Sequence, residues 1–199
     1  QTIFSGEQEL QDTYARKNLT IFFSDIYQFT DLSDTLEPEK LAKVMNSYLS
    51  EMTVVALECG GTIDKFIGDA ILVFFGDPDS RGEANDAMAC VEMALRMQQR
   101  IDELQDHWKK QSVTNGLKVR MGITTGYCTV GNFGSNQRMD YTVLGKPVNL
   151  ASRLESLASP GEILISDSTH ALVEHQTRCT PYDEIQPKGF ARSVKVHKV

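Results

Sequence analysis

Two aspartates stand out because each ends an apolar run with the composition of a β-strand. Asp25 lies in FFSDIYQFT, and Asp69 lies in DKFIGDAILVFFG. A carboxylate at the tip of a buried strand is costly unless a cation or a set of hydrogen bonds satisfies it. Two such carboxylates brought together would suit a hard divalent cation. The alternative is that both are ordinary turn residues, a common place for aspartate.

The elements that would position these aspartates are predicted from the first eighty residues. Residues 19–26 form a short β-rich run typical of a central strand. Apolar residues at helical spacing predict a helix that begins at Pro38 and ends at a Gly-Gly pair. The run TIDKFI, the step Gly68-Asp69 and the run AILVFFG predict a tight hairpin with a type II′ turn. We therefore expect the hairpin tip to lie near the end of the strand at 19–26.

The rest of the chain predicts further helices and strands. A helix is expected from about Glu83 to Trp108, followed by a half-buried strand around KVRMGITTG. The elements expected after it are two strands joined by a glycine-rich arm at 131–137, a helix from Pro147, the strand EILISD, a short helix at 168–173 and a strand-like tail. This order predicts an α/β (α+β) fold with mostly antiparallel pairing, a ferredoxin-like βαββαβ core with extra C-terminal strands and a helix.

Composition limits the function classes. The 199 residues carry a formal net charge of -7, which argues against a nucleic-acid-binding surface. The four cysteines are widely spaced without a CxxC pair, so neither a zinc site nor a disulfide framework is indicated. We interpret residues 1–16 as a helical lead-in or linker and 17–199 as one domain, cytoplasmic and cut from a longer protein. Whether that parent protein also has an upstream sensor or a membrane domain stays an open question at this point.

Four segments, in the order FFSDIYQFT, DKFIGDAILVFFG, GITTGYCTVGNFGS and DYTVLGKPVNLASRLE, resemble the catalytic domain of class III nucleotidyl cyclases. These enzymes make cyclic AMP or cyclic GMP, and the likeness covers Lys17 to Lys198. It implies the class III cyclase fold. It also implies two Mg²⁺ or Mn²⁺ ions per site, held by Asp25, Asp69 and the backbone carbonyl of Ile26. Such ions would activate the ribose 3′ hydroxyl and neutralise the leaving pyrophosphate.

The resemblance assigns two residues to the choice of base. It makes Lys65 the donor to the adenine ring nitrogen and Thr142 the partner of the exocyclic amino group. A lysine cannot donate to the protonated N1 of guanine, and guanylyl cyclases typically have glutamate and cysteine at these positions. The pair therefore implies ATP as substrate and cyclic AMP with pyrophosphate as products. Read singly, each residue is better explained without a substrate, Lys65 as a surface strand lysine and Thr142 as a β-branched strand residue.

The resemblance assigns catalytic roles to two residues on the helix from Pro147. Asn149 and Arg153 are four residues apart, so they share a helix face. Asn149 would orient the ribose, and Arg153 would stabilise the negative charge of the transferring phosphate. The alternative is an exposed polar pair on an amphipathic helix.

The remaining candidates concern the phosphates. The resemblance assigns phosphate contacts to Lys188 in QPKGF and, less directly, to Arg138 in the glycine-rich arm. Phe29 and Thr30 match the family's substrate-binding turn. Gln28 departs from it, because a glycine is common there and lets the backbone approach the phosphates closely.

In this family each site lies between two subunits. One chain supplies the metal aspartates, and the other supplies the base, ribose and arginine positions. Because this chain carries both sets, the resemblance implies a head-to-tail homodimer with two equivalent sites. Threonine at the position of Thr142 also occurs in members stimulated by bicarbonate, which gives a further hypothesis.

Two alternatives stay open at this stage. A guanylyl or mixed-specificity cyclase is disfavoured by Lys65 and Thr142. A catalytically silent nucleotide-binding or dimerisation module would be expected to lack a metal aspartate, the asparagine or the arginine, and all four are present. A diguanylate cyclase shares the hairpin pattern, but its GGDEF-type turn is absent.

Overall fold

The computed structural model describes residues 14–113, 116–135 and 137–199. In this part of the chain one sheet of eight strands has the order β2-β3-β1-β4-β6-β8-β7, and β5 pairs with β4 outside that path. The strands are β1 (Tyr14–Ile26), β2 (Thr62–Ile67), β3 (Ala70–Phe75), β4 (Val119–Ser135), β5 (Arg138–Leu144), β6 (Ile163–Ser166), β7 (Thr180–Ile185) and β8 (Val194–Lys198). The helices are α1 (Phe29–Thr35), α2 (Pro38–Glu58), α3 (Glu83–Lys110), α4 (Lys146–Leu157) and α5 (Asp167–Val173).

The predicted fold class is confirmed. The sub-order β2-β3-β1-β4, with helices after β1 and after β3, is the ferredoxin-like core. Neighbours in that core pair antiparallel, and β4 with β6 is the parallel pair among those recorded for the described residues. The C-terminal strands and α5 extend this core, as expected.

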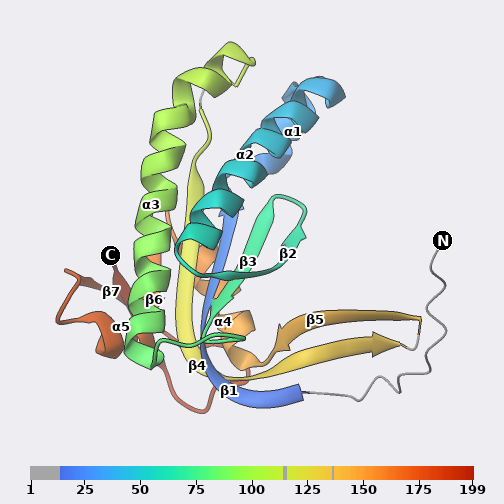
Figure 1. The fold of residues 1–199 in the computed structure, drawn as a ribbon. Coiled ribbons are helices and arrows are strands. Elements are labelled where there is room, and N and C mark those ends of the chain that lie inside the picture. Colours follow the sequence, from blue (N-terminus) through green and yellow to red (C-terminus); the bar gives the residue numbers. More distant parts are fainter. Residues whose placement is uncertain (1–13, 114–115, 136) are drawn as a thin grey trace.

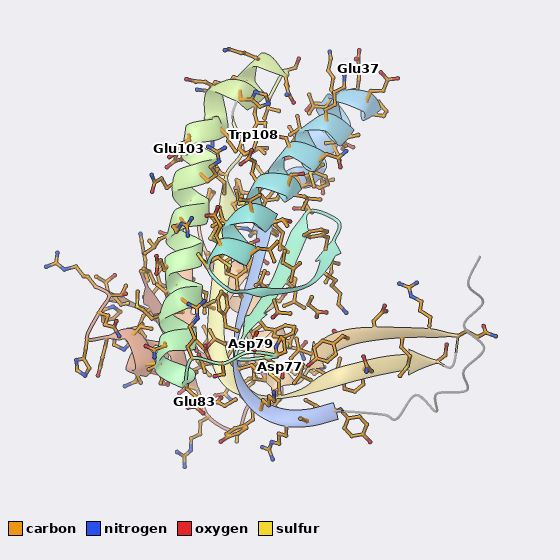
Figure 2. All side chains as sticks on the ribbon, in the orientation of Figure 1. Glu37, Asp77, Asp79, Glu83, Glu103 and Trp108 are labelled. Atoms are coloured by element: carbon orange, nitrogen blue, oxygen red, sulfur yellow. The ribbon has the colours of Figure 1, made fainter. Side chains whose placement is uncertain are left out.

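Helices cover both faces of the sheet (Figure 1). Successive residues of β1 point to opposite sides, so Phe22 packs in the cluster formed with α2 and α3. Leu19 and Ile21 pack on the other side, where α4 contributes Ala151. Figure 2 shows Trp108 on α3 beside α2, where its indole N–H donates to the Ser47 hydroxyl at 3.3 Å. The sheet is therefore fixed between two helical layers.

Glycine at one position lets α4 lie directly on the sheet. A Cβ atom on Gly122 in β4 would lie 2.2 Å from the carbonyl oxygen of Ala151 and 2.4 Å from the backbone nitrogen of Glu155. Both contacts are with backbone atoms of α4, so no side-chain rotation could relieve them. The close approach brings α4 against the strand that carries Arg120.

Two predicted boundaries were wrong. β1 begins at Tyr14, so residues 14–16 are strand and not a helical lead-in; residues 1–13 lie outside the described residues. The glycine-rich arm is mostly strand, because residues up to Ser135 belong to β4 and pair with β5. Both segments are polar, so their sequence alone indicates irregular structure. In each place a neighbouring strand satisfies the backbone hydrogen bonds and makes the segment a strand.

Within the described residues, no helix is both long enough and apolar enough to cross a membrane.

Candidate active site

The tip of the β2–β3 hairpin meets the end of β1, as predicted. Ile67 pairs with Ala70, so the loop is the two residues Gly68 and Asp69. Gly68 has φ +64°, and Asp69 is not among the residues with positive φ, as a type II′ turn requires. The Asp69 Oδ2 accepts a hydrogen bond from the Ile26 N–H at 2.9 Å. This bond holds Asp69 against the residue that directly follows Asp25.

An arginine and a third carboxylate complete this cluster. Arg120, opposite Asp25 in the pairing of β1 with β4, binds Asp25 through two hydrogen bonds. Its Nε donates to Oδ1 at 3.0 Å, and its Nη2 donates to Oδ2 at 2.6 Å. The same Nη2 lies 2.9 Å from Oε1 of Glu155 on α4. Asp25, Asp69, Arg120 and Glu155 are hereafter the carboxylate cluster.

Negative charge exceeds positive charge in the carboxylate cluster. Burial, and then the neighbouring Asp25 carboxylate, raise the pKa of Glu155 to about 8, while Arg120 acts in the opposite direction. Burial also raises the pKa of Asp69, and its hydrogen bond from the Ile26 N–H opposes that shift. One guanidinium therefore lies beside three carboxyl groups, and burial, reinforced at Glu155 by the neighbouring Asp25, opposes the ionisation of Glu155 and Asp69.

These donors fit divalent cations that also bind a polyphosphate. Within the described residues, no group of three or more His, Cys, Asp or Glu side chains is arranged to hold a metal alone. Mg²⁺ in phosphoryl-transfer sites is typically held by one or two carboxylates together with substrate phosphates, so a complete protein cage is not required. Asp25, Asp69 and the Ile26 carbonyl supply oxygen ligands of the kind this coordination uses.

Lys65 and Thr142 meet in a second cluster, through Asp64. The Thr142 hydroxyl on β5 donates to Asp64 Oδ2 at 2.8 Å. Lys65 Nζ lies 3.9 Å from Asp64 Oδ1. The two residues assigned to base selection, 77 positions apart in sequence, thus share one carboxylate neighbour. Asp64, Lys65 and Thr142 are hereafter the base cluster.

A second network fixes the strand that carries Thr142. The Tyr141 hydroxyl donates to one oxygen of buried Asp77, and Lys17 donates to the other. The hydrogen bond to Asp77 is the main reason that the pKa of Tyr141 rises to about 12. Figure 2 shows Asp77 where the projecting pair of β4 and β5 leaves the rest of the sheet. The network around Asp77 therefore ties β5 to β1 next to Thr142.

Asn149 and Arg153 are not brought to the chain's own carboxylate cluster. Both are exposed on α4, whereas Glu155 on the same helix is buried. Arg153 and Glu155 are two positions apart, which is roughly 200° around a helix. One side of α4 therefore holds Arg120, and the other presents Asn149 and Arg153 outward.

The other predicted phosphate ligands are divided between two places. Lys188 is exposed in the loop between β7 and β8, and Lys146 at the start of α4 donates to the carbonyl of Gly189 in that loop. This bond places the loop of Lys188 at the N-terminal end of α4. Arg138 begins β5 at the far end of the projecting arm (Figure 1). Its side chain is 83% exposed and lies 3.6 Å from Asp140.

The turn after β1 explains the preference for glycine at the position of Gln28. Gln28 has φ 55° and ψ 37°, the left-handed conformation that glycine adopts without strain. Its side chain is exposed, as are those of Tyr27 and Thr30. Phe29 begins α1 and packs against the main core, so it holds the turn in place.

Sequence reasoning missed Arg120, Glu155 and Asp64. The signal for Glu155 was available, because it follows Ala151 by four residues and so falls on the apolar side of the helix. A carboxylate in that stripe indicates a buried partner. Arg120 carried a weaker signal, as a charged residue between the apolar Val119 and Met121. Asp64 gave no signal apart from the neighbouring lysine.

A sequence model described as adenylate and guanylate cyclase catalytic domain matches residues 12–199. The crystal structure of the adenylyl cyclase CyaB from P. aeruginosa superimposes with a TM-score of 0.90 at 51% identity, covering 94% of this chain and 95% of that one. The guanylyl cyclase Cya2 superimposes with a TM-score of 0.85 at 37% identity, covering 92% of each chain.

Curated relatives agree with this match and are much longer. An adenylate cyclase from Anabaena cylindrica is 38% identical over 157 residues, which cover 76% of this chain and 30% of the relative. An adenylate cyclase from Rhizobium meliloti is 29% identical over 188 residues, 92% of this chain and 28% of the relative. The chain thus spans less than a third of the length of these relatives.

Proposed function

Since the chain belongs to the class III nucleotidyl cyclase family, through its adenylate and guanylate cyclase catalytic domain, we propose that it is an adenylyl cyclase. It converts ATP into 3′,5′-cyclic AMP and pyrophosphate. The observation that carries this choice is the base cluster, in which the ammonium of Lys65 and the hydroxyl of Thr142 share Asp64. Relatives named as adenylate cyclase support it. Guanylyl cyclases also match, and the base cluster supports ATP rather than GTP as the substrate.

The carboxylate cluster binds the triphosphate end of the substrate. Two Mg²⁺ or Mn²⁺ ions, held by Asp25, Asp69 and the Ile26 carbonyl, would activate the ribose 3′ hydroxyl and neutralise the leaving pyrophosphate. The guanidinium of Arg120 already binds carboxylate oxygens through two N–H groups, and the same planar fork suits phosphate oxygens. Buried Glu155 keeps that guanidinium in place. The exposed turn that leads into Phe29 and Thr30 leaves backbone accessible beside the phosphates.

The remaining groups orient the nucleotide and stabilise charge. Lys65 donates to the adenine ring nitrogen, and Thr142 accepts from the exocyclic amino group. Asn149 hydrogen-bonds the ribose so that its 3′ hydroxyl is directed at the α-phosphate, and Arg153 stabilises the charge that builds up there. Lys188 lies in the loop held at the start of α4, which suits a phosphate contact. Arg138 remains a weaker candidate because of its position on the arm.

A second copy of the chain completes each site. Asn149 and Arg153 are exposed on the side of α4 away from the chain's own Glu155. Because Asn149 and Arg153 must touch the substrate, they must therefore lie next to the carboxylate cluster of another molecule. A head-to-tail homodimer meets this need twice, once at each site.

The direct test is a product assay with the purified 199-residue chain. With Mn²⁺ or Mg²⁺, ATP should yield cyclic AMP with a kcat/KM at least about tenfold higher than that for GTP conversion, and chelation by EDTA should stop it. Nucleotide binding and dimerisation without any product would favour the silent-module alternative. Preferential formation of cyclic GMP would favour the guanylyl cyclase alternative. Adding bicarbonate at fixed pH tests the separate hypothesis of stimulation, which a flat response would reject.

A further inference from the structure

Asp64 lies at an irregularity in β2. The pairing of β2 with β3 shifts register between Ile63 and Lys65, so Asp64 is the additional residue of a β-bulge. In a regular strand, neighbouring side chains point to opposite faces. Here the Asp64 carboxylate instead lies 3.9 Å from Lys65 Nζ. The bulge thus allows two adjacent residues to serve one site.

The Asp64 carboxylate also determines where the Thr142 proton lies. Its side chain is only 1% exposed, and its Oδ2 accepts the Thr142 O–H at 2.8 Å. Burial raises the pKa of Asp64, and the Thr142 hydrogen bond and Lys65 oppose that shift. A hydroxyl has one proton and two lone pairs. Because its proton is directed at Asp64, the Thr142 oxygen has only lone pairs left for another partner.

We infer that Asp64 is a positioning residue for base selection, which fixes the Thr142 hydroxyl as a hydrogen-bond acceptor toward the substrate base. The inference rests on the proposed function and deepens it. Asp64 does not touch the base; it acts through Thr142. The 3.9 Å separation from Lys65 is too long for a hydrogen bond, so the ammonium keeps its donors for the ring nitrogen.

The selectivity follows from the edge that each base presents. Adenine offers an acceptor at N1 and a donor at its 6-amino group, whereas guanine and hypoxanthine offer a donor at N1 and an acceptor at O6. A freely rotating hydroxyl could donate to O6 as easily as it accepts from an amino group. Threonine alone is therefore ambiguous at this position. With its proton held by Asp64, the Thr142 hydroxyl can accept a hydrogen bond from the 6-amino group of adenine. The O6 atom of guanine or hypoxanthine would face only the lone pairs of that hydroxyl.

The test compares ATP with inosine triphosphate, which replaces the 6-amino group by an oxo group and protonates N1. In the 199-residue chain, Asp64→Ala should lower the ratio of kcat/KM for ATP to that for inosine triphosphate about tenfold, the upper range for one neutral hydrogen bond. Thr142→Val should lower it similarly, and the double variant should lower it no further. Asp79→Ala, which removes an exposed carboxylate in the loop after β3, is the matched control and should leave the ratio unchanged.

A second variant covers a failure of Asp64→Ala to fold. Asp64→Asn keeps the shape, but its amide N–H₂ can donate to Thr142 and turn the hydroxyl proton toward the base, so the ratio should fall here too. Equal losses for both substrates in the folded variants would reduce Asp64 to a structural role and overturn the inference. Absence of cyclic AMP from the wild-type chain would instead overturn the proposed function itself. An active wild type with an unchanged ratio in the variants would overturn only the inference.

Discussion

Replacing Asp69 by asparagine should lower turnover of ATP by about a thousandfold, because the lost charge removes several kcal/mol of cation binding and transition-state stabilisation. The Asp69 carboxylate accepts a hydrogen bond from the Ile26 N–H at 2.9 Å. The amide oxygen of asparagine can accept the same bond, so the hairpin tip should stay in place. The melting temperature should change by only a few degrees. Steady-state rates with Mn²⁺ and a thermal melt measure both effects on one sample.

Asp25→Ala should give a loss of the same size. Here Arg120 keeps Glu155 as a partner, so the fold should survive the change. Asp79→Asn, an exposed aspartate in the loop after β3, is the matched control and should keep full activity (Figure 2). If either cluster variant kept wild-type turnover, that residue would be removed from the metal site.

The double substitution Lys65→Glu with Thr142→Cys should reduce kcat/KM for ATP about a hundredfold. A carboxylate in place of the ammonium would face the lone pair of adenine N1, and unpaired polar groups in a site are penalised strongly. GTP conversion should rise relative to ATP conversion. The reversal should be incomplete, because the new carboxylate would lie next to buried Asp64. Parallel assays with both nucleotides give the ratio.

A charge-matched control separates this effect from general electrostatics. Lys195→Glu makes the same charge change at an exposed position on β8 and should leave both rates unaltered. Unchanged ATP kinetics in the double variant would refute the assigned roles of Lys65 and Thr142.

Local signals were enough to predict how Asp25 and Asp69 meet. The hairpin is encoded by the step Gly68-Asp69 between two apolar runs, and the strand end by the polar turn after Ile26. Both signals span fewer than ten residues. The order of helices and strands then limited the topology to the ferredoxin-like core. The convergence of the two aspartates followed from these two steps.

The partners of these aspartates depend on contacts that local patterns do not record. Arg120 lies 95 positions from Asp25, and it meets that residue only because β4 pairs with β1 in one register. Asp64 depends on a bulge in β2, and a strand of six residues is too short for its alternation to reveal one inserted residue. The prediction for residues 14–16 was wrong because this polar segment becomes a strand only through its pairing with the long strand β4. Register and bulges therefore limited the sequence-based prediction.

Mixing two inactive variants tests the central claim most directly, namely that one chain supplies the carboxylate cluster and another supplies Arg153. Chains with Asp25→Ala and chains with Arg153→Ala should each be inactive alone. In a mixed dimer one of the two sites contains neither substitution. Random exchange makes about half of the dimers mixed, so the mixture should recover about a quarter of wild-type cyclic AMP formation. No recovery, with mixed dimers demonstrated by differently tagged chains, would contradict a site shared between subunits.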